Sequence, residues 1–173
     1  MYCHYFQKDI GLILAARFSL YSGDFDNAHR ISKKLLYNAG DNPSTPSEME
    51  ALSIDYWATI LEVRGENDSN YYNEVSHLER IDRHMQDRGR DCTEVDILMA
   101  WAACRVMLGR KADAINVLNK VIAVHPNFAA GLTEKALLLA ASSEWDQALD
   151  TAQRALDIDD KNFDALKVKK LIY

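Results

Sequence analysis

The sequence is poor in residues that break helices and in residues that build specialised chemical sites. It has three prolines, three cysteines and seven glycines in 173 residues. Cys3, Cys92 and Cys104 are too far apart for a CxxC site and odd in number, as is typical of reduced thiols in the cytosol. The glycines are scattered singly, which excludes a glycine-rich phosphate loop. We therefore expect no disulfide, no structural zinc and no cofactor.

Positive charge and long apolar runs are scarce as well. Lys and Arg number 20 against 26 Asp and Glu, a net charge of −6, whereas binding to a nucleic-acid backbone needs a basic stripe. The longest apolar runs, residues 10–16 and 97–104, are far shorter than the roughly 20 residues that a membrane-spanning helix needs. No basic segment precedes residues 10–16, as one would in a signal peptide. We expect a cytoplasmic protein without nucleic acid or inserted membrane as partners.

The sequence does contain a repeat of 34 residues. Residues 95–128 and 129–162 superimpose with their apolar, small and turn residues in register, and 34 is the tetratricopeptide period. Three marker residues return one period later: Gly109 as Ser143, Ala114 as Ala148, and Pro126 as Asp160. The period predicts an all-α fold, a right-handed α-solenoid of tetratricopeptide-type helix-turn-helix repeats.

The pattern continues upstream with less regular spacing. The turn at residues 23–28 repeats the one after Gly109, and Thr45-Pro46-Ser47-Glu48 is a capping box with proline at the first helical position. The second helix of that hairpin is irregular, with an apolar face predicted at Tyr72, Val75, Leu78, Ile81 and Met85. We expect one array over residues 1–173, with units at about 9–42, 46–88, 95–128 and 129–162 and a truncated helix at 163–173.

One small residue recurs at the same place in the first helix of every unit. It is alanine each time: Ala16, Ala58, Ala102 and Ala136. Two helices approach to about 8 Å only where a small side chain lies between them. These four recurrent alanines therefore predict four buried helix crossings.

No catalytic constellation is found. His77 and His84 lie seven residues apart on one helix, too far for two metal ligands on adjacent turns. Their neighbours Glu79, Asp82 and Arg83 are typical of a solvated face. We expect neither a metal site nor enzyme activity.

Cysteine and tryptophan side chains are expected to belong to the core. Cys104 lies within a predicted helix without a paired base, which favours an inert buried thiol. Trp57, Trp101 and Trp145 occupy core positions of their repeats, so a stacking platform for a base or a cofactor is not expected.

First-helix positions that are not needed for packing predict a concave protein-binding groove. Its expected residues are mostly apolar: Ile13, Leu14, Arg17, Tyr56, Met99, Ala103, Met107 and Leu137. Such a groove favours an amphipathic helix of a partner, with the methionines as adaptable contacts. The alternative is that the array itself fills part of this surface. A chaperone adaptor would need several donors around a peptide carboxylate, and only Arg17 is available.

The last predicted helix carries a second apolar set, Leu166, Leu171 and Ile172, which we expect to contact a neighbouring repeat. The chain is expected to stop inside a repeat, as a segment of a longer array would, and to self-associate weakly through this helix. The alternative is a cap folded onto its own array.

Several short motifs resemble the tetratricopeptide repeat protein 21 family, the large repeat subunit of intraflagellar transport complex A. They are Trp145-Asp146-Gln147, Thr151-Ala152-Gln153-Arg154, Asn162 with Ala165-Leu166, and Trp57 with Arg64-Gly65. The resemblance implies a non-catalytic scaffold in retrograde ciliary transport, with other complex A subunits as partners and a location at the cilium or flagellum and its base. A stand-alone peptide-binding adaptor or chaperone cofactor is the alternative.

Overall fold

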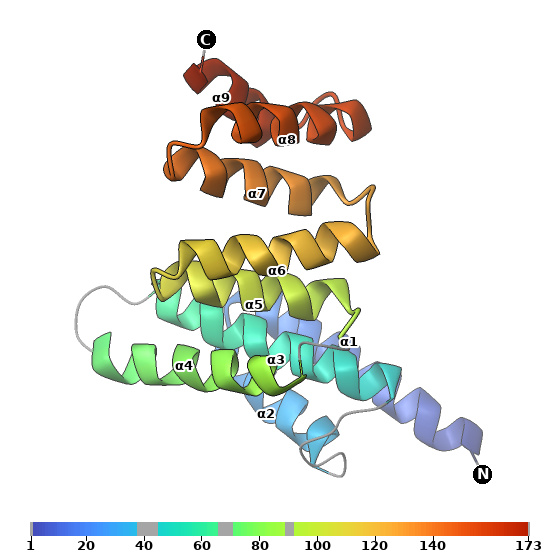
Figure 1. The fold of residues 1–173 in the computed structure, drawn as a ribbon. Helices are drawn as coiled ribbons and strands as arrows, with labels where there is room; N and C mark the ends of the chain where they lie inside the picture. Colours follow the sequence, from blue (N-terminus) through green and yellow to red (C-terminus); the bar gives the residue numbers. More distant parts are fainter. Residues whose placement is uncertain (1, 38–44, 66–70, 89–91, 173) are drawn as a thin grey trace. The chain divides into compact units, whose positions relative to one another are not determined.

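The computed structural model describes residues 2–37, 45–65, 71–88 and 92–172, and the side chains of residues 10–37, 45–64, 75–87 and 92–171. These ranges contain helices and no strand (Figure 1). The helices are α1 (Tyr2–Ser22), α2 (Phe25–Leu36), α3 (Pro46–Gly65), α4 (Tyr71–Arg88), α5 (Val95–Met107), α6 (Lys111–Val124), α7 (Ala129–Ala141), α8 (Trp145–Ile158) and α9 (Phe163–Ile172). They form two compact units, Met1–His84 and Met85–Tyr173.

In the first unit, α1 packs against α2 and α3, and α2 packs against α3. The core that joins these three helices consists of Ile13, Ala16, Ala28, Ile31, Ile54 and Ala58. Leu12, Leu20, Phe25 and Leu35 are half-buried around it. The alanines in so small a core allow the three backbones to approach closely.

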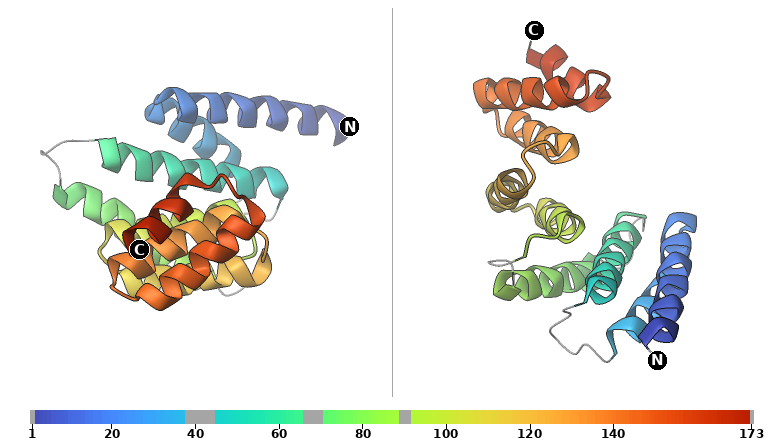
Figure 2. Two further views of the ribbon diagram at one scale, coloured as in Figure 1. Left: turned by 90° about the horizontal axis from the view of Figure 1, so that it is seen from above. Right: turned by 90° about the vertical axis from the view of Figure 1, so that its right-hand side faces the viewer.

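In the second unit, each helix from α5 to α9 packs against the next one along the chain (Figure 2), and α9 also reaches α7. Its C-terminal core consists of Leu132, Ala136, Leu139, Ala140, Ala148, Ala152, Ala155, Ala165 and Val168. Six of these nine residues are alanines. Short side chains between neighbouring helices are what the alternating hairpin pattern requires.

The recurrent first-helix alanines are buried, as predicted. Ala16, Ala58 and Ala136 are 0% exposed and Ala102 is 3% exposed. The second-helix alanines Ala114 and Ala148 are also fully buried. The repeat register read from the sequence therefore agrees with the packing of these helices.

Local signals in the sequence set the ends of several helices. The capping box before α3 is formed: the Thr45 amide donates to Glu48 Oε2 at 2.9 Å, and the Glu48 amide donates to Thr45 Oγ1 at 3.3 Å. The turns after α1, α5 and α7 each contain one residue with positive φ: Gly23 at 79°, Gly109 at 73° and Ser143 at 62°. Ser143 thus adopts a left-handed conformation that favours glycine.

Two expectations about single side chains are wrong. Trp145 is 46% exposed at the start of α8, where it lies before the first buried turn of the helix rather than in the core. Asp82 is 1% exposed, although its neighbours suggested a solvated face. The reason is helical spacing: Leu78, Ile81, Asp82 and Met85 recur at i, i+3, i+4 and i+7, so all four lie on the buried face of α4.

The rest of the predicted α4 face is confirmed where it is described, because Leu78, Ile81 and Met85 are at most 3% exposed and Val75 is half-buried. The side chain of Tyr72 lies outside the described residues, and so does the predicted end of the first unit at residue 42. Division of the chain into four repeat units remains a prediction.

Replacing Ala148 by leucine tests the close crossing of α7 and α8. Ala148 has no exposed surface, so the larger side chain must push the helices apart, and we expect a loss of about 1 to 3 kcal/mol in the free energy of unfolding. The matched control is Ala141→Leu, at an exposed position of α7. Urea unfolding of both variants measures the difference; equal effects would show that Ala148 is not at a tight crossing.

Exchanging the turn residues Ser143 and Gly109 should have opposite effects. Ser143→Gly relieves a left-handed serine and should raise stability by about 0.5 to 1 kcal/mol, while Gly109→Ser should lower it by a similar amount. A Cβ at Gly109 would meet no atom within 4 Å, so the backbone conformation alone is tested. The urea midpoints of the two variants should move in opposite directions; a shift in the same direction would contradict this account.

Candidate protein-binding surfaces

The four predicted groove residues of the first unit lie in different environments. Ile13 is 7% exposed and belongs to the α1–α2–α3 core. Tyr56 is 4% exposed, and its hydroxyl is hydrogen-bonded to His84 Nδ1 on α4. The Tyr56 and His84 rings also meet edge to face, with centroids 6.0 Å apart. Ile13 and Tyr56 therefore hold helices together and offer little surface to a partner.

The other two, Leu14 and Arg17, lie at the surface of α1. Leu14 is 61% exposed. Arg17 Nε lies 2.5 Å from Glu50 Oε1 on α3, so this guanidinium already has a carboxylate partner. An arginine engaged in this way is poorly placed to hold the carboxylate of a peptide.

In the second unit, Met99, Ala103 and Met107 form one stripe along α5. They are spaced four residues apart, which places them on the same side of the helix, and each is half-buried. Leu137 on α7 is also half-buried and packs against the C-terminal core. A stripe with two methionines is apolar and adaptable, which suits the apolar face of a helix.

Helix α9 has one buried and one open side. Ala165 and Val168 are fully buried, whereas Leu166 is 44% and Leu171 is 72% exposed. The side chain of Ile172 lies outside the described residues. Two exposed lysines lie next to the open leucines: Lys167 is four residues before Leu171, and Lys170 is four residues after Leu166. The open side of α9 therefore combines apolar and basic groups.

Asn162 ties the start of α9 to the preceding hairpin. Its Oδ1 accepts a hydrogen bond from the Ala165 amide at 3.0 Å, and its Nδ2 donates to Thr133 Oγ1 on α7 at 2.9 Å. A helix cap that also bonds a neighbouring helix fixes the direction in which α9 leaves α8.

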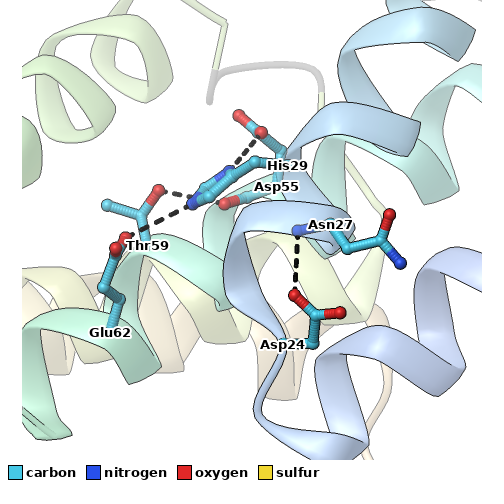
Figure 3. A network of polar contacts seen from close by, with 6 residues as sticks. All are labelled: Asp24, Asn27, His29, Asp55, Thr59 and Glu62. Atoms are coloured by element: carbon cyan, nitrogen blue, oxygen red, sulfur yellow. Dashed lines mark hydrogen bonds and ion pairs between the residues drawn. The ribbon is translucent and has the colours of Figure 1, made fainter.

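A polar cluster between α2 and α3 is the feature that the sequence reasoning missed. His29 on α2 lies between two acidic residues of α3 (Figure 3): its Nδ1 is 2.7 Å from Asp55 Oδ1 and its Nε2 is 3.5 Å from Glu62 Oε2. One signal for it was present in the sequence, because His29 is a polar residue at a repeat position that is otherwise apolar. The position lies thirteen residues after the recurrent alanine, and α6 and α8 carry Ile115 and Leu149 there.

The surroundings of His29 favour its charged form. The hydrogen bond to Asp55 raises the pKa of His29 above its ordinary value of 6.5, and the charges of Asp55 and Glu62 act in the same direction. Burial and the nearby Lys33 lower the pKa of His29 without cancelling this rise. The protonated imidazole thus links α2 to α3 through charge-assisted hydrogen bonding.

Other kinds of site have no support among the described residues. No three His, Cys, Asp or Glu side chains in these ranges are grouped so that they could hold a metal ion. No helix in the same ranges combines the length and apolar character needed to cross a membrane. Cys104 is fully buried, as expected for an inert thiol.

Comparison with protein families gives one match over most of the chain. Residues 7–149 match the family described as "Tetratricopeptide repeat protein 21 N-terminal ARM repeat". The chain is 30% identical to tetratricopeptide repeat protein 21B of Homo sapiens over 91 residues, and 33% identical to that of Xenopus laevis over 86 residues. These regions cover 53% and 50% of this chain and 7% of each relative.

A second kind of relative is more distant. Over 104 residues, 60% of this chain and 19% of the relative, the chain is 27% identical to Hsp70-Hsp90 organizing protein 3 of Arabidopsis thaliana. Among solved structures, a thermophilic TPR protein of Thermus thermophilus has a TM-score of 0.74 at 18% identity, over 92% of this chain and 78% of that one. The MamA protein has a TM-score of 0.67 at 19% identity, over 95% and 80%. The predicted fold class, an all-α solenoid of tetratricopeptide hairpins, is confirmed.

Replacing His29 by glutamine should destabilise the first unit in a pH-dependent way. Because the pKa of His29 is raised in the folded state, its stabilising charge is fully present below about pH 6.5 and is lost as the pH rises through the raised value. We expect His29→Gln to cost about 1 kcal/mol at pH 5.5 and much less at pH 9. Urea unfolding at the two pH values measures this.

The control for this prediction is Asp55→Asn, which removes the charged acceptor. It should abolish most of the difference between the two pH values, because the main cause of the raised His29 pKa is gone. A cost of His29→Gln that is the same at pH 5.5 and pH 9 would show that the imidazole acts only by its shape.

Proposed function

The chain belongs to the tetratricopeptide repeat protein 21 family, and from this we propose that it is a segment of an intraflagellar transport complex A subunit that acts in retrograde ciliary transport and cilium assembly. At the coarser level, the chain is a non-catalytic helical-repeat scaffold for protein interaction. The family match over residues 7–149 is the observation that carries the proposal. The proposed partners are the other complex A subunits, and the proposed location is the cytoplasm and the cilium or flagellum with its base.

The proposed role belongs to a protein much longer than this chain. The chain spans about 7% of the length of the tetratricopeptide repeat protein 21B relatives, so the assembly of the whole protein is inferred from a short stretch. Surface chemistry supports a scaffold role: the stripe Met99–Ala103–Met107 on α5 is apolar and half-buried, which suits a neighbouring helix in a large assembly.

The second candidate is a chaperone cofactor, favoured by the 27% identity to the Arabidopsis organizing protein. Its binding of an acidic peptide would require fixed cationic donors. Among the predicted groove residues only Arg17 is cationic, and it is paired with Glu50. This candidate therefore has the weaker support.

Expression of the tagged chain in ciliated cells tests the main proposal. We expect the chain to gather at the base of the cilium and complex A subunits, identified by mass spectrometry, to be captured with it. Changing Met99 and Met107 to glutamate should reduce that capture about tenfold, since both side chains lie in the apolar stripe. The matched control is Val124→Glu, at a 37% exposed position on α6, which should leave capture unchanged.

A peptide-binding measurement with the same chain tests the second candidate, the chaperone cofactor. Fluorescence anisotropy with an acidic chaperone-tail peptide and a scrambled peptide should show equal, weak binding. Micromolar, salt-sensitive binding that Arg17→Ala abolishes would favour the chaperone cofactor, as would the absence of complex A subunits from the captured material.

A further inference from the structure

The outer side of α1 is an exposed apolar stripe. It consists of Ile10, Leu14, Phe18 and Tyr21, which are 43%, 61%, 75% and 83% exposed. Their spacing of four, four and three residues places them on one side of the helix. Gly11 lies beside them, and a Cβ there would meet no atom within 4 Å. This side of α1 is therefore open along its described length.

The opposite side of the same helix is apolar too. Ile13 and Ala16 are buried against α2 and α3, with Leu12 and Leu20 half-buried around them. In residues 10–22 the only charged side chain is Arg17, which is paired with Glu50. Both sides of this helix are thus mostly apolar, and an exposed apolar patch of this kind is typical of an interaction site.

Comparison along the repeat shows what kind of partner fits. Phe18 stands two residues after the recurrent alanine, where the later helices carry Ile60, Cys104 and Leu138. Those three residues are 2%, 0% and 7% exposed, against 75% for Phe18. In the later helices this position is therefore buried, whereas in α1 it is open. A helix packed on this side of α1 would bury Phe18 as its counterparts are buried.

We propose that the open side of α1 packs against the same side of α1 in a second copy of this chain. A twofold pair places the stripe against itself. Arg17, three residues after Leu14 and four before Tyr21, is the one charge on this side of the helix, and it is already paired with Glu50. The small residues Gly11 and Ala15 next to Leu14 and Phe18 let two helices approach closely. This inference goes beyond the proposed function and does not depend on it.

The area of the stripe fits a weak dimer. An aromatic side chain buries about 150 to 250 Å² when it is fully covered, and Phe18 and Tyr21 are mostly exposed. Leu14 and Ile10 add their own exposed area to the stripe. The stripe then supplies about 400 to 500 Å² per copy, near the lower limit of about 1,000 Å² in total for a specific interface. We expect a dissociation constant of about 10 to 100 µM.

The same comparison explains why the pair forms through α1 rather than α9. Arg17 of α1 is paired with Glu50, and Lys167 of α9 is likewise paired with Asp164. Helix α9 carries a further exposed charge, Lys170, four residues after the open Leu166, so two copies of that helix would bring like charges together. Lys170 also stands one period after Ala136, at the place where a close crossing needs alanine. The self-association expected from the sequence is therefore assigned to α1.

Sedimentation equilibrium of the chain over residues 1–173, from about 5 to 500 µM, tests the proposal. The wild-type chain should pass from monomer to dimer, and Phe18→Glu and Leu14→Glu should each weaken dimerisation at least tenfold. Because both side chains are exposed, circular dichroism and the melting temperature of dilute samples should stay unchanged.

Two control variants complete the experiment. Tyr37→Glu changes an 86% exposed aromatic residue away from the stripe, and it should leave the dimer intact. Leu171→Glu with Ile172→Lys, on α9, should also leave it intact. A wild-type chain that stays monomeric up to the highest concentration overturns the proposal, and so does a dimer that is lost with the α9 changes but survives Phe18→Glu.

Discussion

The close approach of paired helices at buried alanines is the constraint on which the rest of this structure depends. Ala16, Ala58, Ala102 and Ala136 recur in the first helices, and none of them is more than 3% exposed. A small side chain at a crossing brings the backbones to about 8 Å, so the larger residues on either side interlock. Each helix is thereby placed by its nearest neighbours, which is how repeat proteins gain stability.

Polar contacts distinguish individual helix-helix interfaces from one another. Between α2 and α3, His29 lies between the carboxylates of Asp55 and Glu62, where the later hairpins have Ile115 and Leu149. Between α7 and α9, Asn162 caps one helix and bonds Thr133 of the other. Such contacts contribute modestly to stability. A hydrogen bond is directional, so within an apolar helix-helix interface it fixes the register of the two helices, which non-directional contacts of alanines cannot do.

The rule that builds the core also accounts for the open surfaces. A helix in a stacked array needs a neighbour on two sides, so a helix with a neighbour on only one side presents an apolar face to solvent. Helix α1 does so through Leu14, Phe18 and Tyr21, and α9 through Leu166 and Leu171. The two faces differ in chemistry, because two lysines accompany the leucines of α9, whereas the one charge near the aromatic residues of α1, Arg17, is paired with Glu50. The open faces of α1 and α9 are thus chemically distinct.

The sequence by itself determined the helical hairpins, their period of 34 residues, the buried alanines and the capping box, because these depend on local spacing and on short-range hydrogen bonds. Only the tertiary structure decided which side chains remain accessible. Ile13 and Tyr56 were expected in a groove and lie in the core, Trp145 was expected in the core and lies at the surface, and Asp82 is buried. The pairing of His29 with Asp55 likewise joins residues 26 positions apart. Exposure and pairing depend on which neighbouring helix covers each face, and the periodicity of a single helix does not contain that information.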